Sequence, residues 1–281
     1  MLRRRLWALI ILVFILSSFA LAKDATLTPE EIVAKHIDSI GTKQARDAAN
    51  SRELTGKAHM DPLVGGVGGS LTGDGLVLSE GKKVKIGMKF GDPNYPQEQL
   101  VFDGSRVIIG TIKPGTRSAL GQFLNVHQDI LKEGLLGGSL SSAWPLLDLE
   151  GRKPKLTYNG LKKVGPRQLH ELKYVPRKGD DRLQVRLYFE PETFRHVRTT
   201  YEVLMPPEMN GGIFDTQLRT EKRFLLEELF SDFRPVNGLM LPATYNLQFS
   251  ADMELKTGIW SFQMSLADFN GVPFPAATAG Q

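Results

Sequence analysis

The 281-residue sequence contains no cysteine. Disulfides are therefore excluded, and so is a lipid attached to an N-terminal cysteine after a leader is removed. The sequence also lacks an uninterrupted apolar run of about twenty residues, which is the length that a helix needs to cross a bilayer. From these absences we expect a chain that is held to a membrane neither by a lipid nor by a spanning helix.

The longest apolar run is short and lies at the start of the chain. It extends from Leu6 to Phe19, follows three consecutive arginines, and ends at Ala20-Leu21-Ala22. A charged start, a short apolar centre and a small-x-small ending are typical of a cleaved secretory signal. The alternative is an uncleaved signal that anchors the protein.

This pattern also sets the expected domain limits. We expect residues 1–22 to be a cleaved signal peptide, residues 23–272 to form a single domain and residues 273–281 to be a flexible tail. A domain of this size can fold on its own hydrophobic core without disulfides, which favours a bacterial envelope compartment. The predicted location is the periplasm, in soluble form.

The charge of the chain is small once the signal is set aside. The formal charge of +4 falls to +1 when the three arginines of the signal are removed. A nucleic-acid surface needs clustered Lys and Arg, so nucleic acid is not expected as a partner. Hydrophobic residues make up 41% of the sequence, which is enough for a substantial core.

Two segments have helical spacing. Thr28-Pro29-Glu30-Glu31 has the residues of a capping box, and Gly41 is suited to end the helix that follows. A second amphipathic helix is predicted from Ser118 to Glu133, with glycines on both sides of it that would allow it to move as a flap. Its apolar stripe includes Leu120, Phe123 and Leu124.

Much of the remaining chain alternates with the period of a β-strand. In Lys83–Phe90 the apolar side chains share one face and three lysines share the other. Asp103-Gly104 and Asn237-Gly238 are typical hairpin turns. In total the sequence predicts roughly ten strands and two or three helices.

The predicted helices are too few to cover the apolar face of the predicted sheet. A helix is about 10 Å wide and strands lie about 4.8 Å apart, so one helix covers about two strands. Two or three helices would leave about half of the sheet uncovered. We therefore predict a mainly β, α+β fold, in which a curved antiparallel sheet forms an unclosed β-barrel lidded by helices. Such a barrel can enclose a hydrophobic cavity.

Motifs for catalysis or metal binding are incomplete. The glycine run at residues 65–69 lacks the Gly-Lys-Ser/Thr of a phosphate loop, and Gly68-Gly69-Ser70-Leu71-Thr72 lacks the last glycine of a nucleophile elbow. The five histidines have no zinc-ligand spacing. Adjacent acids such as Glu227-Glu228 would point to opposite faces of a strand, and Asp180-Asp181 is better explained as a turn. We expect no enzyme activity, no catalytic residue, no metal and no cofactor.

The order of the elements resembles a known family. The segments that carry the likeness are Thr28–Gly41, the strand and turn at Leu187–Thr193, and Phe230–Gly238 followed by Leu241-Pro242. Together they resemble the periplasmic outer-membrane lipoprotein carriers of the LolA/LolB-like superfamily. This resemblance implies an unclosed antiparallel barrel with helices that lid a hydrophobic cavity for acyl chains. It assigns no residue of this chain a role position by position.

The leading hypothesis is a soluble, monomeric carrier of lipid or lipoprotein acyl chains, in transient contact with membranes and with envelope membrane proteins as further partners. Its rivals are an envelope signalling or scaffold protein of the same fold that binds another protein, and a hydrolase of envelope polymers. The lid residues of the carrier would be Leu120, Phe123 and Leu124. The predicted cavity-wall residues are Val84, Ile86, Met88, Phe90, Leu183, Val185, Leu187 and Phe189.

Overall fold

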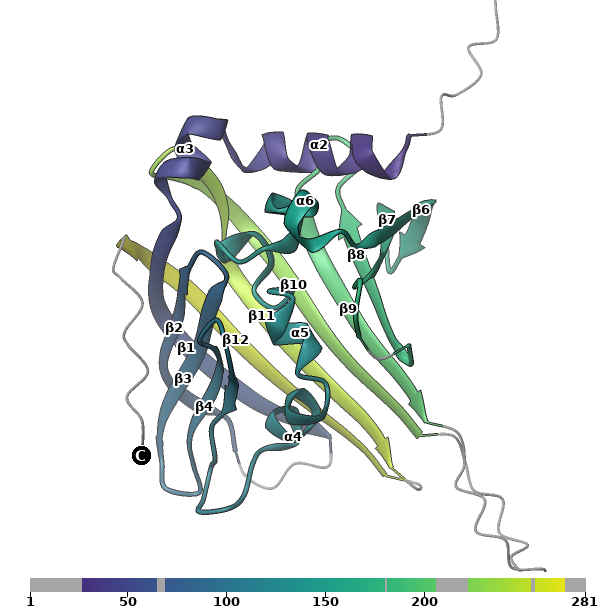
Figure 1. Cartoon of the computed structure of the whole chain (residues 1–281). Helices are drawn as coiled ribbons and strands as arrows, with labels where there is room; N and C mark the ends of the chain where they lie inside the picture. Colours follow the sequence, from purple (N-terminus) through teal and green to yellow (C-terminus); the bar gives the residue numbers. More distant parts are fainter. Residues whose placement is uncertain (1–26, 65–68, 180, 206–221, 254–255, 271–281) are drawn as a thin grey trace, which may run out of the picture.

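The computed structural model describes residues 27–64, 69–179, 181–205, 222–253 and 256–270. Within these residues, twelve antiparallel strands form one sheet in the order β5-β4-β3-β2-β1-β12-β11-β10-β9-β8-β7-β6. The two ends of this order do not pair with each other, so the sheet is open. Figure 1 shows it bending around α4 and α5, with α2 lying across the opposite end from α4.

The elements follow the chain in a simple order. The strands are β1 (Ser51–Val64), β2 (Leu71–Glu80), β3 (Lys83–Asp92), β4 (Tyr95–Phe102), β5 (Val107–Ile109), β6 (Lys155–Val164), β7 (Arg167–Val175), β8 (Leu183–Phe189), β9 (His196–Met205), β10 (Lys222–Val236), β11 (Leu239–Met253) and β12 (Lys256–Asn270). The helices are α2 (Pro29–Ile40), α3 (Lys43–Ala48), α4 (Ala119–Val126), α5 (Asp129–Lys132) and α6 (Leu149–Arg152), with 3₁₀ turns η1 (Gly138–Leu140) and η2 (Pro145–Leu147).

Helix α2 is set by its first and last residues. The Thr28 hydroxyl accepts a hydrogen bond from the Glu31 amide, and the Glu31 carboxylate accepts one from the Thr28 amide, which forms the predicted capping box. Helix α2 buries Ile32, Val33, His36 and Ile40. At its end Gly41 bridges to Leu239 at the start of β11, which fixes the helix over one end of the sheet.

The concave face of the sheet is covered by the segment between β5 and β6, which we call the helical insertion (residues 110–154). It contains α4, α5, η1, η2 and α6, and it buries Leu131, Leu135, Leu140 and Trp144. Gly134 allows the chain to turn closely here, because its φ is +70° and a Cβ would lie 2.2 Å from the Ala143 carbonyl oxygen.

The unclosed antiparallel fold predicted from the sequence is confirmed, with twelve strands in place of roughly ten. The turn at Asp103-Gly104 connects β4 to β5, and the turn at Asn237-Gly238 connects β10 to β11. The single helix predicted from Ser118 to Glu133 is instead two helices, because the chain leaves helical geometry at His127, where φ is −102° and ψ is 54°.

Some predictions lie outside the described residues. These are the signal at 1–22, the glycine run at 65–68, Asp180 and the tail at 273–281. Among the described residues, none of the helices is long and apolar enough to cross a membrane.

Candidate functional site

The predicted wall and lid residues belong to one continuous core cluster. On β3 and β8 the predicted wall residues are buried in this cluster, and only Leu183, the first residue of β8, is partly exposed. The lid residues Leu120, Phe123 and Leu124 lie on α4 and are also buried. The sequence pattern therefore identified which faces point inward.

Helix α4 begins at Ser118, whose hydroxyl accepts a hydrogen bond from the Gly121 amide at 2.8 Å. The same hydroxyl donates a hydrogen bond to the Glu98 carboxylate at 2.9 Å, and the Tyr95 hydroxyl donates another. Glu98 is 2% exposed, and its burial raises the pKa of this carboxyl to about 7. One end of α4 is thus attached to β4 by a buried polar contact.

One face of α4, from Ala119 to His127, borders a small apolar hollow, which we call the α4 cleft. Its volume is about 180 Å³. Its lining residues are Ala119, Gln122, Phe123, Val126, His127, Met205, Phe224, Phe249 and Ala251. The Phe123 ring lies 5.1 Å from the Phe249 ring and 6.4 Å from the Phe224 ring, measured between centroids. Val126 is 58% exposed at the edge of the cleft. The cleft joins the lid helix to the ends of β9, β10 and β11.

Two groups of buried polar side chains attach the helical insertion to the sheet. In the first, both Tyr201 and Tyr245 donate hydrogen bonds to the Glu228 carboxylate, at 2.6 and 2.7 Å. The Gly137 amide donates a third at 2.7 Å. Glu228 is fully buried, and burial raises the pKa of its carboxyl to about 7. The carboxyl therefore anchors the insertion at Gly137.

The second group consists of two histidines and a tryptophan. The Trp144 indole donates a hydrogen bond to His36 Nε2 at 3.0 Å, and His36 Nδ1 lies 3.1 Å from the Phe194 carbonyl oxygen. These contacts require neutral His36, and burial lowers its pKa to about 4. The Trp144 ring stacks on His196 with a centroid distance of 4.7 Å.

His196 Nε2 also lies 2.9 Å from the Thr199 hydroxyl, which is the contact that a general base makes with a nucleophile. Both side chains are fully buried. Phe189 and Phe230 pack against the histidine ring, so the pair is closed off from any substrate in this structure. Among the described residues, no group of three or more His, Asp or Glu side chains has the geometry to hold a metal ion.

Sequence reasoning missed Glu228, His36 and His196 as members of these buried polar groups. Glu227 and Glu228 do point to opposite faces, as predicted: Glu227 pairs with Arg198, whereas Glu228 is buried. The available signal was the alternation of β10, in which Glu228 lies between the inward-facing Leu226 and Phe230. An acid at an inward position indicates a buried polar contact.

Comparison with known proteins identifies solved structures that are similar to this chain, and the three described next share 8–12% of their residues with it. The chain is similar to a domain from Vibrio parahaemolyticus described as an outer membrane lipoprotein-sorting protein, with 10% identity, a TM-score of 0.44, and coverage of 86% of this chain and 92% of that one. It is also similar to a DUF1329 family protein from Desulfovibrio piger, with 12% identity, a TM-score of 0.43, and coverage of 87% and 94%.

A third similar structure is the lipoprotein LppX of Mycobacterium tuberculosis, with 8% identity, a TM-score of 0.23, and coverage of 88% of this chain and 98% of that one. No family model matches the chain, and no curated protein matches it. These similarities describe how the backbone is arranged in space, and they assign no function to this chain.

Proposed function

We propose that this protein is a soluble periplasmic carrier that binds an acyl chain of a lipid or lipoprotein beneath α4. The observation that carries the proposal is the α4 cleft, an apolar hollow of about 180 Å³ that begins at the surface beside Val126 and leads under the lid helix. Burial of an acyl chain there would contribute about 0.8 kcal/mol for each CH₂ removed from water. Such binding needs no covalent chemistry and no cofactor.

The size of the cleft requires α4 to move. Pockets that enclose small-molecule ligands usually measure about 300–1,000 Å³, which is larger than the cleft. The lid helix lies between Gly115 and Gly134, whose φ angles are +74° and +70°. In the proposed mechanism α4 swings out about these positions, and the acyl chain takes the place of Leu120, Phe123 and Leu124 against the sheet.

The predicted wall residues would then contact the ligand. Those on β3 and β8 are now buried in the same core cluster as the residues of α4, and lifting the lid would extend the apolar surface of the cleft toward them. Transport of an acyl chain in this way requires transient contact with a donor membrane and an acceptor membrane, or with a membrane protein in each of them. The carrier would act without catalysis.

A fluorescence titration with the methyl ester of cis-parinaric acid, a neutral acyl probe, tests the proposal. Val126→Glu places a carboxylate at the edge of the cleft on a side chain that is 58% exposed, so the core is left intact. We expect the affinity for the probe to fall by about tenfold, which corresponds to about 1.4 kcal/mol. The matched control is Leu161→Glu on β6, because Leu161 is 52% exposed and the charge change is the same.

Equal affinities for wild type, Val126→Glu and Leu161→Glu would overturn the proposal, as would a wild type that does not bind the probe. Native mass spectrometry of protein isolated from its own envelope adds a second readout. A bound lipid supports the carrier function. A bound protein in place of lipid would instead favour the signalling or scaffold alternative.

A further inference from the structure

A second and larger hollow lies at the end of the molecule opposite α4, between α3, the turn from β2 to β3, and the segment from Ser142 to Arg152. We call it the basic pocket; its volume is about 580 Å³, within the range of ligand sites. Its lining residues are Ile37, Lys43, Arg46, Asp47, Ala49, Asn50, Arg52, Gly81, Lys82, Ser142, Ala143, Trp144, Leu146, Leu147, Asp148 and Arg152.

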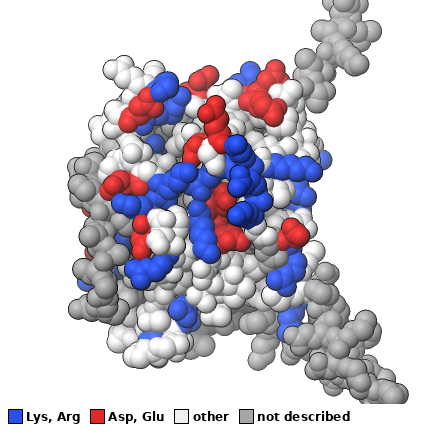
Figure 2. All heavy atoms as spheres, viewed as in Figure 1, with Lys and Arg blue, Asp and Glu red and all other residues white. Residues whose placement is uncertain are grey.

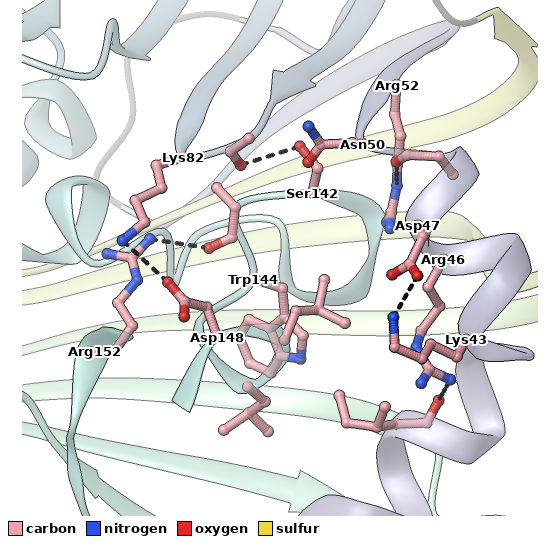
Figure 3. Close-up of a pocket in the computed structure, with 16 residues that line it drawn as sticks. Lys43, Arg46, Asp47, Asn50, Arg52, Lys82, Ser142, Trp144, Asp148 and Arg152 are labelled. Atoms are coloured by element: carbon pink, nitrogen blue, oxygen red, sulfur yellow. Dashed lines mark hydrogen bonds and ion pairs between the residues drawn. The ribbon is translucent and has the colours of Figure 1, made fainter. Parts of the chain in front are cut away.

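The walls of the basic pocket carry five cationic side chains and two carboxylates. Figure 3 shows Lys82 and Arg152 on one side of the pocket, and Lys43 and Arg46 of α3 on the other, with Trp144 between them. Figure 2 shows Lys and Arg side chains, with some Asp and Glu among them, in the middle of the face that carries α5 and α6. The cationic side chains of the pocket therefore outnumber its carboxylates.

Both carboxylates of the pocket are already paired. Asp47 lies 2.5 Å from the Lys43 ammonium, and Asp148 lies 3.0 Å from the Lys82 ammonium. None of the three arginines of the lining forms an ion pair with these two carboxylates in the described part of the chain, although Arg152 is close enough to Asp148 to interact with it electrostatically. The net charge that the walls present to a ligand is therefore positive and concentrated in guanidinium groups, which bind phosphate and carboxylate in a fork geometry.

Arg52 is the most unusual of these arginines. Its side chain is 1% exposed, and its recorded hydrogen bonds are to the carbonyl oxygens of Ala49 at 2.9 Å and Ser139 at 2.8 Å. Among the described residues, no carboxylate lies within ion-pair distance of it. Burial lowers the pKa of Arg52 to about 10, so it is still charged at neutral pH. A buried cation without a counter-charge is unfavourable, and an anion in the pocket would relieve that cost.

Arg152 is also largely buried, with 8% of its side chain exposed. Its Nη atoms donate to the Lys132 and Ala143 carbonyl oxygens, and its ion pair with Glu133 is long, at 3.8 Å. Its Nε is buried and has no hydrogen-bond partner in the described part of the chain. A donor of this kind usually has a partner when it is buried, and a bound oxygen atom would supply one.

We propose that the basic pocket binds a phosphate group. The pocket has more cationic side chains than carboxylates, so it suits a ligand group that carries more than one negative charge. A phosphate monoester carries a charge of about −1.5 to −2 at pH 7. Trp144, Leu146 and Leu147 add apolar surface beside the cations, so the group would belong to a larger molecule with an apolar part. The site lies at the other end of the molecule from the α4 cleft and does not depend on acyl binding.

The phosphate could belong to a soluble ester or to a lipid headgroup, and two probes separate these sources. Calorimetric titration with inorganic phosphate measures the shared chemistry. Sedimentation with phosphatidylcholine vesicles, with and without phosphatidic acid, measures binding to a headgroup. We expect phosphate to bind, and competition between phosphate and phosphatidic acid vesicles would assign the site to a lipid headgroup.

The test variant is Lys43→Glu/Lys82→Glu. Both lysine side chains are mostly exposed, at 81% and 59%, so the substitutions change the charge of the walls without disturbing the core. We expect phosphate affinity to fall by at least about tenfold. The control is Lys162→Glu/Lys163→Glu on β6, which makes the same charge change on exposed lysines outside the pocket and should stay within about twofold of wild type.

A second variant, Arg152→Gln, removes the unpaired Nε. Its phosphate affinity is measured together with its thermal unfolding, which shows whether the variant remains folded. Binding that is lost while the protein remains folded supports the proposal. If neither probe binds to wild type, the proposal is wrong. It is equally wrong if the pocket variant and the β6 control lose the same affinity, because general charge would then explain the binding. Neither result affects the acyl-chain experiment, which reads out the α4 cleft.

Discussion

At the scale of single residues, the buried carboxyls make stability depend on pH. Glu228 has an unfolded pKa near 4.5 and a folded pKa of about 7, because burial disfavours its charged form. The folded state therefore holds this proton more tightly than the unfolded state. Its contribution is fully present below pH 4.5 and is lost as the pH rises toward 7.

We predict that Glu228→Gln removes this dependence. The free energy of unfolding of the variant, relative to wild type, should rise between pH 4.5 and pH 7 by on the order of 3 kcal/mol. Denaturant titrations at several pH values measure the difference. The buried Glu98, His36 and His196 also titrate, but they are present in both proteins and cancel in the comparison.

The matched control is Glu150→Gln, since Glu150 is exposed on α6. Its difference from wild type should be independent of pH over the same range. A Glu228→Gln difference that is equally flat would show that the carboxyl is as easily ionised in the folded protein as in the unfolded chain. The raised pKa that burial gives Glu228 would then be wrong.

At the scale of elements, the N-cap residue of α4 both caps the helix and attaches it to the sheet. Ser118 caps the helix through Gly121 and also donates to the buried Glu98. Ser118→Ala should lower the free energy of unfolding by about 1 kcal/mol, the usual effect of removing such a cap. It should also speed hydrogen exchange of the α4 amides, because the helix loses its polar attachment to β4.

Thr28→Ala is the control for this experiment, because Thr28 caps α2 at the opposite end of the molecule. It should cost a similar free energy while exchange in α4 stays as in wild type. If both variants change α4 exchange equally, the lid helix opens only with global unfolding. The local motion that acyl binding requires would then be absent.

The same comparison shows what the sequence can and cannot predict. Caps, turns and inward faces are local properties, so Thr28, Asp103-Gly104 and the alternation of β3 were predicted correctly. The break between α4 and α5 was not, because the residues from Ser118 to Glu133 keep one apolar stripe across it. The packing of the insertion against the sheet fixes the break, and sequence periodicity does not contain that information.

The two candidate sites also differ in how far the sequence predicts them. The amphipathic stripe predicts Phe123 as a lid residue; Phe123 lines the α4 cleft, and its role as a lid stays a prediction. The basic pocket was missed because its cations come from α3, from β1, from the turn between β2 and β3, and from α6. No spacing in the sequence links Arg46, Lys82 and Arg152, since only the fold brings them together.

At the scale of the whole molecule, an open sheet has two edges that could pair with another copy. One edge is β5, which is only three residues long. The other is β6, which is exposed along most of its length and carries three lysines. It also contains a bulge between Tyr158 and Leu161. Short strands, lysines and bulges are the features that keep sheet edges from aggregating.

We predict that Lys162→Thr/Lys163→Thr causes association through β6. Threonine favours strands and removes the charge repulsion between two copies of the edge. Sedimentation velocity should show a monomer for wild type and concentration-dependent dimers or larger species for the variant.

The control is Lys85→Thr/Lys89→Thr, which makes the same change on β3, a strand already paired on both sides with β2 and β4. Association of both variants would point to lost net charge, and association of neither would mean that the bulge alone protects the edge. Association of the β6 variant alone would show that two lysines keep an open twelve-stranded sheet monomeric, which the proposed carrier function requires.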